Sequence, residues 1–160
     1  MQKIVTHLWF DTQAEEAVTF YTSLFNDSSI GAIARYGDSM AEVAGRPKNS
    51  VMTVEFKLNG QDFLALNGGP LFKFNESISL LVHCESQEEV DRLYGKLSQG
   101  GQAQPCGWLK DKYGLSWQIV PTVLTELVKS KDPQAVERVM KAMLGMKKLD
   151  IRELQQAARG

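Results

Sequence analysis

Few side chains in this sequence have the chemistry of a catalyst or a metal ligand. It contains two histidines, His7 and His83, and two cysteines, Cys84 and Cys106. A histidine titrates near neutral pH, so His83 could act as an acid or base, although a single strand histidine is more often a hydrogen-bonded residue at a rim. The cysteines lie far apart and form no C-x-x-C pair. We therefore expect two reduced thiols rather than a disulfide or a zinc site.

A further candidate, Gln118, lies in the segment Asp111–Pro121, which reads D-K-Y-G-L-S-W-Q-I-V-P. The segment begins with a tight-turn signal, because aspartate can bond its own backbone and glycine accepts a positive φ. The following strand alternates, with one apolar face made by Leu115, Trp117 and Ile119. An amide centred on the other face is typical of a sheet that lines a pocket, and also of a strand that faces solvent. Both interpretations stay open.

Composition excludes several classes of protein. The chain has 160 residues, enough for one domain or for two small modules that share a core. Hydrophobic residues make up 43% and charged residues 23%, as in soluble globular proteins. The net charge of −1 gives no electrostatic footprint for nucleic acid or an anionic membrane. Because we find neither a signal peptide nor an 18-residue apolar segment, we expect a cytoplasmic protein without a membrane span.

The first half predicts a strand, a helix and three further strands. Alternation favours a strand over residues 3–10, and a capping-box pattern of Thr12 and Glu15 favours a helix that runs to about residue 25. A strand over 29–36 precedes a long, glycine-containing stretch, 37–50, that we expect to be a mobile loop. The Asn59-Gly60 pair then predicts a hairpin between strands 51–58 and 61–67.

The pattern begins again after Gly68-Gly69-Pro70. An apolar strand over 78–84 is followed by E-S-Q-E-E-V, which resembles D-T-Q-A-E-E-A-V at residues 11–18. The second helix ends at Gly100-Gly101, and strands are expected over 102–110 and 115–120. Two capped strand-helix units could resemble each other by chance, but an internal duplication would constrain the fold strongly.

Beyond residue 121 the pattern changes to helices. We expect them over 121–128, from 133 to 144 and over 150–157. The middle helix has Pro133 at its first position and an apolar stripe made by Ala135, Val136, Val139, Met140, Met143 and Leu144. This stripe needs a partner surface. The chain's own sheet and a second subunit are equal alternatives.

Several motifs together resemble the PhnB-like branch of the glyoxalase, bleomycin-resistance and dioxygenase superfamily, also called the vicinal oxygen chelate fold. They are H-L-W-F-D with A-E-E-A-V, Phe20-Tyr21, A-L-N-G-G-P, C-G-W-L-K-D-K-Y-G-L-S-W-Q-I-V-P and V-M-K-A-M-L-G-M-K-K-L-D-I. The resemblance covers nearly the whole chain. It implies an α+β fold in which two βαβββ modules, residues 1–70 and 71–121, form a curved mixed-sheet cup, with a helical extension at 122–160. It also implies a homodimer.

Metal-using members of this superfamily place His, Glu or Gln at four strand positions that face the cup. Matched to this sequence, those positions fall at Thr6, Phe63, Ser79 and Gln118, and a shift of one residue would bring in His7. Only Gln118 would ligate well, because hydroxyls and a phenyl ring offer little to a divalent cation. We therefore expect no metal cofactor.

Two functions from different classes remain. The first is a binding module whose cup holds a small apolar or aromatic molecule, and the second is a lyase, isomerase or dioxygenase that recruits a metal through His7 and Gln118. In a third possibility the cup is collapsed and the dimer surface is the function. The branch carries the label 3-demethylubiquinone-9 3-methyltransferase, but the sequence has no doubly wound unit with a glycine-rich first turn to hold a methyl donor. The residues expected to contact a ligand are Thr6, Leu8, Phe63, Asn67, Ser79, Leu81, His83, Trp108 and Gln118.

Overall fold

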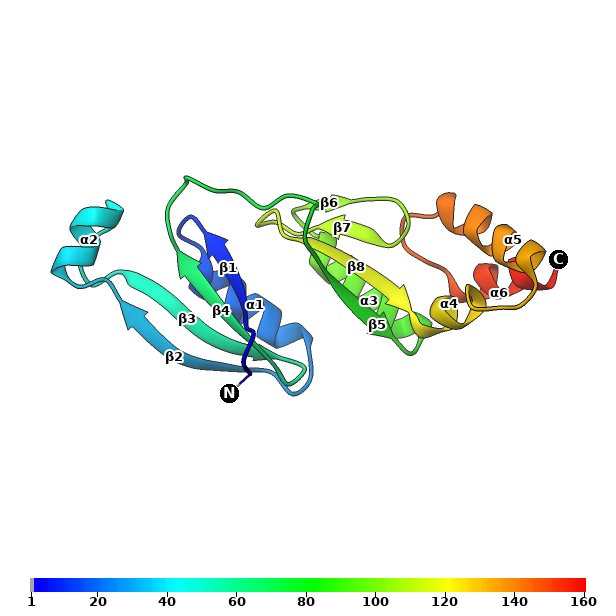
Figure 1. The fold of residues 1–160 in the computed structure, drawn as a ribbon, viewed down its shortest axis with the longest axis horizontal. Helices are drawn as coiled ribbons and strands as arrows, with labels where there is room; N and C mark the ends of the chain where they lie inside the picture. The colour runs from blue at the N-terminus through cyan, green and yellow to red at the C-terminus, as the bar shows by residue number, and fades with distance from the viewer. Residues whose placement is uncertain (1) are drawn as a thin grey trace. The chain divides into compact units, whose positions relative to one another are not determined.

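The computed structural model describes residues 2–160, and its contacts divide the chain into two compact units, residues 1–73 and 74–160. Each unit contains one four-stranded mixed sheet with a helix packed on it (Figure 1). The first unit contains β1 (Thr6–Phe10), α1 (Ala14–Leu24), β2 (Ser29–Arg35), α2 (Asp38–Ala44), β3 (Val51–Leu58) and β4 (Gln61–Asn67). The second contains β5 (Ser79–Cys84), α3 (Gln87–Ser98), β6 (Gln102–Ala103), β7 (Trp108–Lys110), β8 (Ser116–Pro121), α4 (Thr122–Leu127), α5 (Pro133–Leu144) and α6 (Ile151–Arg159).

The two sheets have the same topology. Their strand orders are β1-β4-β3-β2 and β5-β8-β7-β6, and in each the first and last strands of the unit pair in parallel while the other pairs are antiparallel. The predicted α+β fold with two βαβββ modules and a C-terminal helical segment is thereby confirmed. The predicted hairpin is also present, since Leu58 pairs with Gln61 across Asn59 and Gly60, both at positive φ.

The helices α1 and α3 each cover one face of the sheet in their own unit and form its core. In the first unit α1 packs on β3 and β4, and in the second unit α3 packs on β8 and β7. The buried apolar residues of α1 are Ala14, Ala17, Val18, Tyr21 and Leu24, and those of α3 are Val90, Leu93, Tyr94 and Leu97. The opposite face of each sheet is not covered by α1 or α3, and in the first unit it adjoins the short helix α2. A ligand-contacting face must therefore be sought there.

The capping box predicted at Thr12 is wrong. The helix α1 begins one residue later, with Gln13 as N-cap and no capping bond from its side chain. Instead, the side-chain oxygen of Asn67 accepts a hydrogen bond of 2.8 Å from the Ala14 N–H. The second helix does use a local cap, because Ser86 Oγ accepts from the Glu89 N–H.

The loop predicted over residues 37–50 contains the short helix α2. Gly37 is its N-cap, and Gly45, with φ 62°, ends it in the left-handed conformation that favours glycine. The glycines that suggested a loop are therefore the boundaries of a helix. The strand predicted over 102–110 is similarly interrupted between β6 and β7, where Cys106 and Gly107 adopt positive φ.

The three C-terminal helices belong to the second unit. They enclose an apolar cluster made by Leu124, Val139, Met146, Leu149 and Leu154. Backbone hydrogen bonds of 2.8 and 2.7 Å join Cys106 N–H to Met146 and Gly107 N–H to Lys147. Of the predicted stripe, Ala135 and Val139 are buried by these contacts, whereas Leu144 is 69% exposed. In the described part of the chain no helix combines the length and the apolar character that crossing a membrane requires.

Candidate functional site

The uncovered face of the second sheet brings together five of the predicted ligand-contacting residues. The register places Gln118 of β8 between Leu81 of β5 and Trp108 of β7. Ser79 and His83 lie two residues on either side of Leu81, so strand alternation puts them on the same face. The side chains of the other face, such as Trp117 and Ile119, are fully buried under α3.

A direct polar contact links two members of this group. Gln118 Nε2 donates a hydrogen bond of 2.9 Å to Ser79 Oγ. The amide carbonyl oxygen takes no part in that bond and is the acceptor that Gln118 offers to a ligand. Leu81 is 47% exposed and Trp108 is half-buried, so apolar surface flanks the polar pair. A face of this kind suits a molecule with an apolar body and one hydrogen-bonding group.

The other residues of the motif D-x-x-G-x-x-W-Q stabilise the local structure. The buried Asp111 carboxylate accepts hydrogen bonds from the Tyr113 and Leu115 N–H groups at 2.8 and 3.1 Å, and from Trp117 Nε1 at 2.9 Å. The Asp111 carboxylate thus fixes both the turn before β8 and the Trp117 side chain within that strand. Within this motif, Gln118 is the residue that the strand turns toward the open face.

Four predicted residues, Thr6, Leu8, Phe63 and Asn67, lie on the covered face of the first sheet. Asn67 Oδ1 accepts from the first N–H of α1, which places its side chain on the helix side. Strand alternation puts Phe63 and Ala65 on the same side as Asn67. Thr6 pairs with Phe63 and Leu8 pairs with Ala65, so Thr6 and Leu8 also lie on that side. Leu8, Phe63 and Asn67 are 4, 6 and 5% exposed. Leu8, Phe63 and Asn67 therefore belong to the core, so the prediction that these three residues contact a ligand needs correction, whereas that for the partly exposed Thr6 stays a prediction.

The opposite face of the first sheet carries residues that the sequence analysis did not select as ligand contacts. They are His7, Trp9, Leu64 and Leu66, with His7 paired to Leu64 and Trp9 to Leu66. A shift of one residue along the strand pattern would have identified these residues, but such a shift was considered only for His7. Because each strand has apolar residues at both parities, the covered face could not be identified without the helix.

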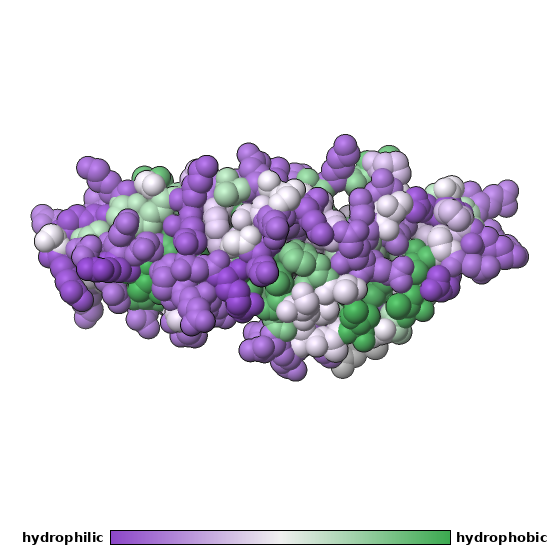
Figure 2. All heavy atoms as spheres, turned by 180° about the vertical axis from the view of Figure 1, so that it is seen from behind, coloured by the Kyte–Doolittle hydropathy of each residue, from purple (hydrophilic) through white to green (hydrophobic). Residues whose placement is uncertain are grey.

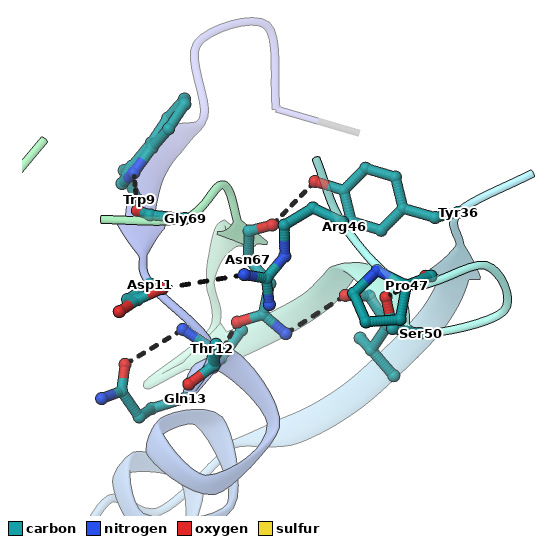
Figure 3. Close-up of polar contacts among 12 residues, drawn as sticks. Trp9, Asp11, Thr12, Gln13, Tyr36, Arg46, Pro47, Ser50, Asn67 and Gly69 are labelled. Atoms are coloured by element: carbon teal, nitrogen blue, oxygen red, sulfur yellow. Dashed lines mark hydrogen bonds and ion pairs between the residues drawn. The ribbon is translucent and has the colours of Figure 1, made fainter. Parts of the chain in front are cut away.

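A cavity of about 580 Å³ lies where this open face meets α2. Trp9 and Leu66 contribute from the sheet, Met52 from β3, and Tyr36 and Arg46 from the segments that flank α2. Figure 3 shows Tyr36 and Arg46 next to Asn67, with Trp9 apart from them beside Gly69, to which it is hydrogen-bonded. Remaining lining residues are Met40, Val43, Ala44, Gly45, Gly68, Gly69, Pro70 and Leu71.

The Gly68-Gly69 pair after β4 holds Trp9 in place. A Cβ on Gly68 would lie 2.3 Å from the Trp9 ring, so only glycine fits beneath it. Gly69, at φ 89°, turns its carbonyl toward Trp9 Nε1, which donates a hydrogen bond of 2.9 Å. Phe72 packs edge-on against the same ring at a centroid distance of 4.9 Å. The segment after β4 therefore positions the indole ring of Trp9.

The side chains present do not supply the donor set that the metal-using enzymes of the superfamily have. Within residues 2–160, no group of three or more His, Cys, Asp or Glu side chains is placed to hold a metal ion. The polar pair on the second sheet, Gln118 and Ser79, consists of neutral oxygens and a nitrogen already joined by a hydrogen bond. No metal-assisted step follows from this arrangement. The expected lack of a metal cofactor stays a prediction.

The repeated βαβββ unit has the topology expected for the glyoxalase/bleomycin-resistance fold. Residues 2–120 match the family described as 3-demethylubiquinone-9 3-methyltransferase, and the chain belongs to this PhnB-like family. No curated protein matches the chain.

Several solved structures are similar to this chain. The PhnB protein from Bacillus cereus is 39% identical, covering 75% of this chain and 99% of its own, with a TM-score of 0.64. A Pseudomonas aeruginosa protein is 21% identical over 76% of this chain and 98% of its own, with a TM-score of 0.60. A glyoxylase/bleomycin resistance protein/dioxygenase domain from a Frankia species is 15% identical over 76% of this chain and 92% of its own, with a TM-score of 0.46.

Proposed function

We propose that the protein binds a small apolar or aromatic molecule on the open face of its second sheet, without a stable metal. The observation that carries the proposal is the row formed by Leu81, Gln118 and Trp108, which offers apolar surface on both sides of an anchored amide. Exposed apolar side chains beside one polar group are the usual lining of a ligand site. His83, exposed on the same face, is a rim residue in this proposal.

The family's methyltransferase description does not fit the binding elements that a methyl donor commonly uses. Such donors commonly lie at a glycine-rich turn between a strand and a helix of a doubly wound sheet. In this chain the turn from β1 to α1 is Asp11-Thr12-Gln13, and the turn from β5 to α3 is Glu85-Ser86. Both turns lack glycine. We therefore propose ligand binding rather than methyl transfer.

We also propose that the protein acts as a cytoplasmic homodimer. The edge strand β2 is exposed along its whole length, and its Ile30 and Ile33 are 47 and 45% exposed. Figure 2 shows hydrophobic patches that interrupt a largely hydrophilic surface. Exposed apolar strands at a sheet edge favour association with another chain. The two cysteines are free thiols in the structure, which supports a reducing compartment.

The experiment is a thermal-shift screen of aromatic metabolites and antibiotics, followed by calorimetry of each hit. Leu81→Asn should weaken binding of a hit by about 5- to 10-fold, because it removes part of the apolar contact. Ile4→Asn is the control, since Ile4 is an exposed apolar residue of the first unit that belongs to neither proposed contact surface. Gln118→Leu should weaken binding of hits that carry a hydrogen-bond donor and spare those that lack one.

Metal analysis of the purified protein separates binding from metal-assisted catalysis. The proposal expects substoichiometric nickel, zinc, manganese and iron, with ligand binding unaffected by a chelator. Stoichiometric metal that is lost in Gln118→Ala would favour the enzyme instead. If Leu81→Asn and Ile4→Asn had equal effects on every hit, the second-sheet face would not be the site.

A further inference from the structure

The cavity beside α2 in the first unit contains a single charged side chain, that of Arg46, among the described residues that line it. Arg46 is held by its position directly after α2, where its own N–H bonds to the Ala41 carbonyl at 3.0 Å. Its side chain is only 16% exposed. A guanidinium that is mostly removed from water needs acceptors to replace the lost hydration.

The chain supplies Arg46 with little compensation. Its nearest ion-pair contact is from Nη1 to Asp11 Oδ1 at 3.8 Å, beyond hydrogen-bonding distance, and the Asp11 side chain is 45% exposed (Figure 3). Among residues 2–160 the buried Nε has no hydrogen-bond partner. Guanidinium groups bind carboxylates through two parallel N–H bonds. The cation thus lacks the partner that its geometry suits.

The rest of the cavity is apolar, and much of it is uncovered. Met40, Val43 and Leu71 are 53, 85 and 75% exposed, although all three line the same cavity. The Trp9 ring and Leu66 form the sheet side of it. Exposed apolar side chains that surround a hollow of this volume are the usual setting for the apolar body of a small ligand.

We propose that this cavity binds an organic carboxylate, with its aromatic or aliphatic body against Trp9 and Leu66 and its carboxylate on the guanidinium of Arg46. The site goes beyond the function proposed above, because it lies in the first unit and uses none of the second-sheet residues. A movement of the half-exposed Asp11 side chain away from Arg46 would free both terminal guanidinium nitrogens for the ligand. The charge of the ligand, rather than its size, decides recognition.

The test compares acids with neutral amides of the same shape. The probes are benzoate, 2-naphthoate and indole-3-acetate, each paired with its amide, and binding to the full chain is measured by calorimetry. Each acid that binds should do so about 10- to 100-fold more tightly than its amide, as expected for charge-assisted hydrogen bonds. Arg46→Met should remove this preference and leave the amide's affinity unchanged. Lys3→Met, which deletes the same charge at an exposed position of the same unit, should not.

A second variant keeps the proposal testable if Arg46→Met fails to fold. Asp11→Asn removes the carboxylate that competes for Arg46, so it should raise the affinity for the acids severalfold and leave the amides unaffected. The proposal is overturned if no acid binds more tightly than its amide, or if Asp11→Asn lowers acid affinity. It is also overturned if the apolar rim proves to be filled by a second copy, so that Val43→Glu dissociates an oligomer while no acid binds.

Discussion

Replacing Asp111 by asparagine should destabilise the second unit by about 2 to 3 kcal/mol. The carboxylate accepts hydrogen bonds from the Tyr113 and Leu115 N–H groups, and an asparagine side-chain oxygen can retain them. The amide NH₂ would then face Trp117 Nε1, so that two donors meet where a bond of 2.9 Å existed. Asp111 is 2% exposed, so water cannot replace the lost acceptor. A buried donor left without a partner costs about 1 to 3 kcal/mol in addition to the weakened charge-assisted bonds.

The assay is a double-mutant cycle with Trp117→Phe, followed by equilibrium urea unfolding. Trp117→Phe removes the indole N–H, so Asp111→Asn should be about 1 to 2 kcal/mol less destabilising in that background. Costs that add within about 0.5 kcal/mol would refute the claim that Asp111 acts through Trp117. Ligand affinity of the folded Asp111→Asn protein should equal that of the wild type, because Asp111 faces the core side of the turn rather than the open face.

Two further predictions follow from buried groups. Asn67→Ala should destabilise the first unit by about 2 to 3 kcal/mol, because the Ala14 N–H and the Val51 carbonyl lose their side-chain partners. The control Thr12→Ala should change the free energy of unfolding by less than about 0.5 kcal/mol. Equal costs of the two variants in urea unfolding would support a Thr12 cap instead. Burial, followed by the charge of nearby Glu89, raises the pKa of the Cys84 thiol from 9.0 to about 12. Because the pKa is raised in the folded state, the Cys84 thiol favours folding below pH 9, and this contribution is lost as the pH rises toward 12. Since the buried thiol forms little thiolate at pH 8, iodoacetamide should label Cys84 far more slowly than an unstructured cysteine peptide in a mass-spectrometric time course.

The sequence was sufficient to predict the second unit's open face. In β8 the two parities differ in chemistry, with Trp117 and Ile119 on one side and Gln118 on the other, so the polar side could be assigned before the helix was placed. In β5, Ser79 was placed by the family resemblance, and alternation put Leu81 and His83 on the same face. The register of β5 with β8 agrees with that placement.

The first unit offered no such contrast. In β1 both parities include large apolar residues, with Leu8 and Phe10 on one side and Trp9 on the other. The covered side is decided by α1, whose position depends on a contact between Ala14 and Asn67, 53 residues away. Periodicity within a window of a few residues does not contain that information. The prediction consequently placed core residues in the ligand site and missed Trp9.

The same long-range contact shows how far the two repeats have diverged beneath a similar sequence pattern. Asn67 and Pro121 end β4 and β8 at equivalent places, opposite Phe10 and Cys84. A proline side chain has no hydrogen-bonding group, so α3 must be capped locally by Ser86, whereas α1 takes its cap from the sheet. The amide of Asn67 is committed on both sides, to Ala14 and to Val51, and is therefore not available to a ligand. A polar ligand contact in the first unit must come from outside this core, and Arg46 is the charged group that the adjoining cavity supplies.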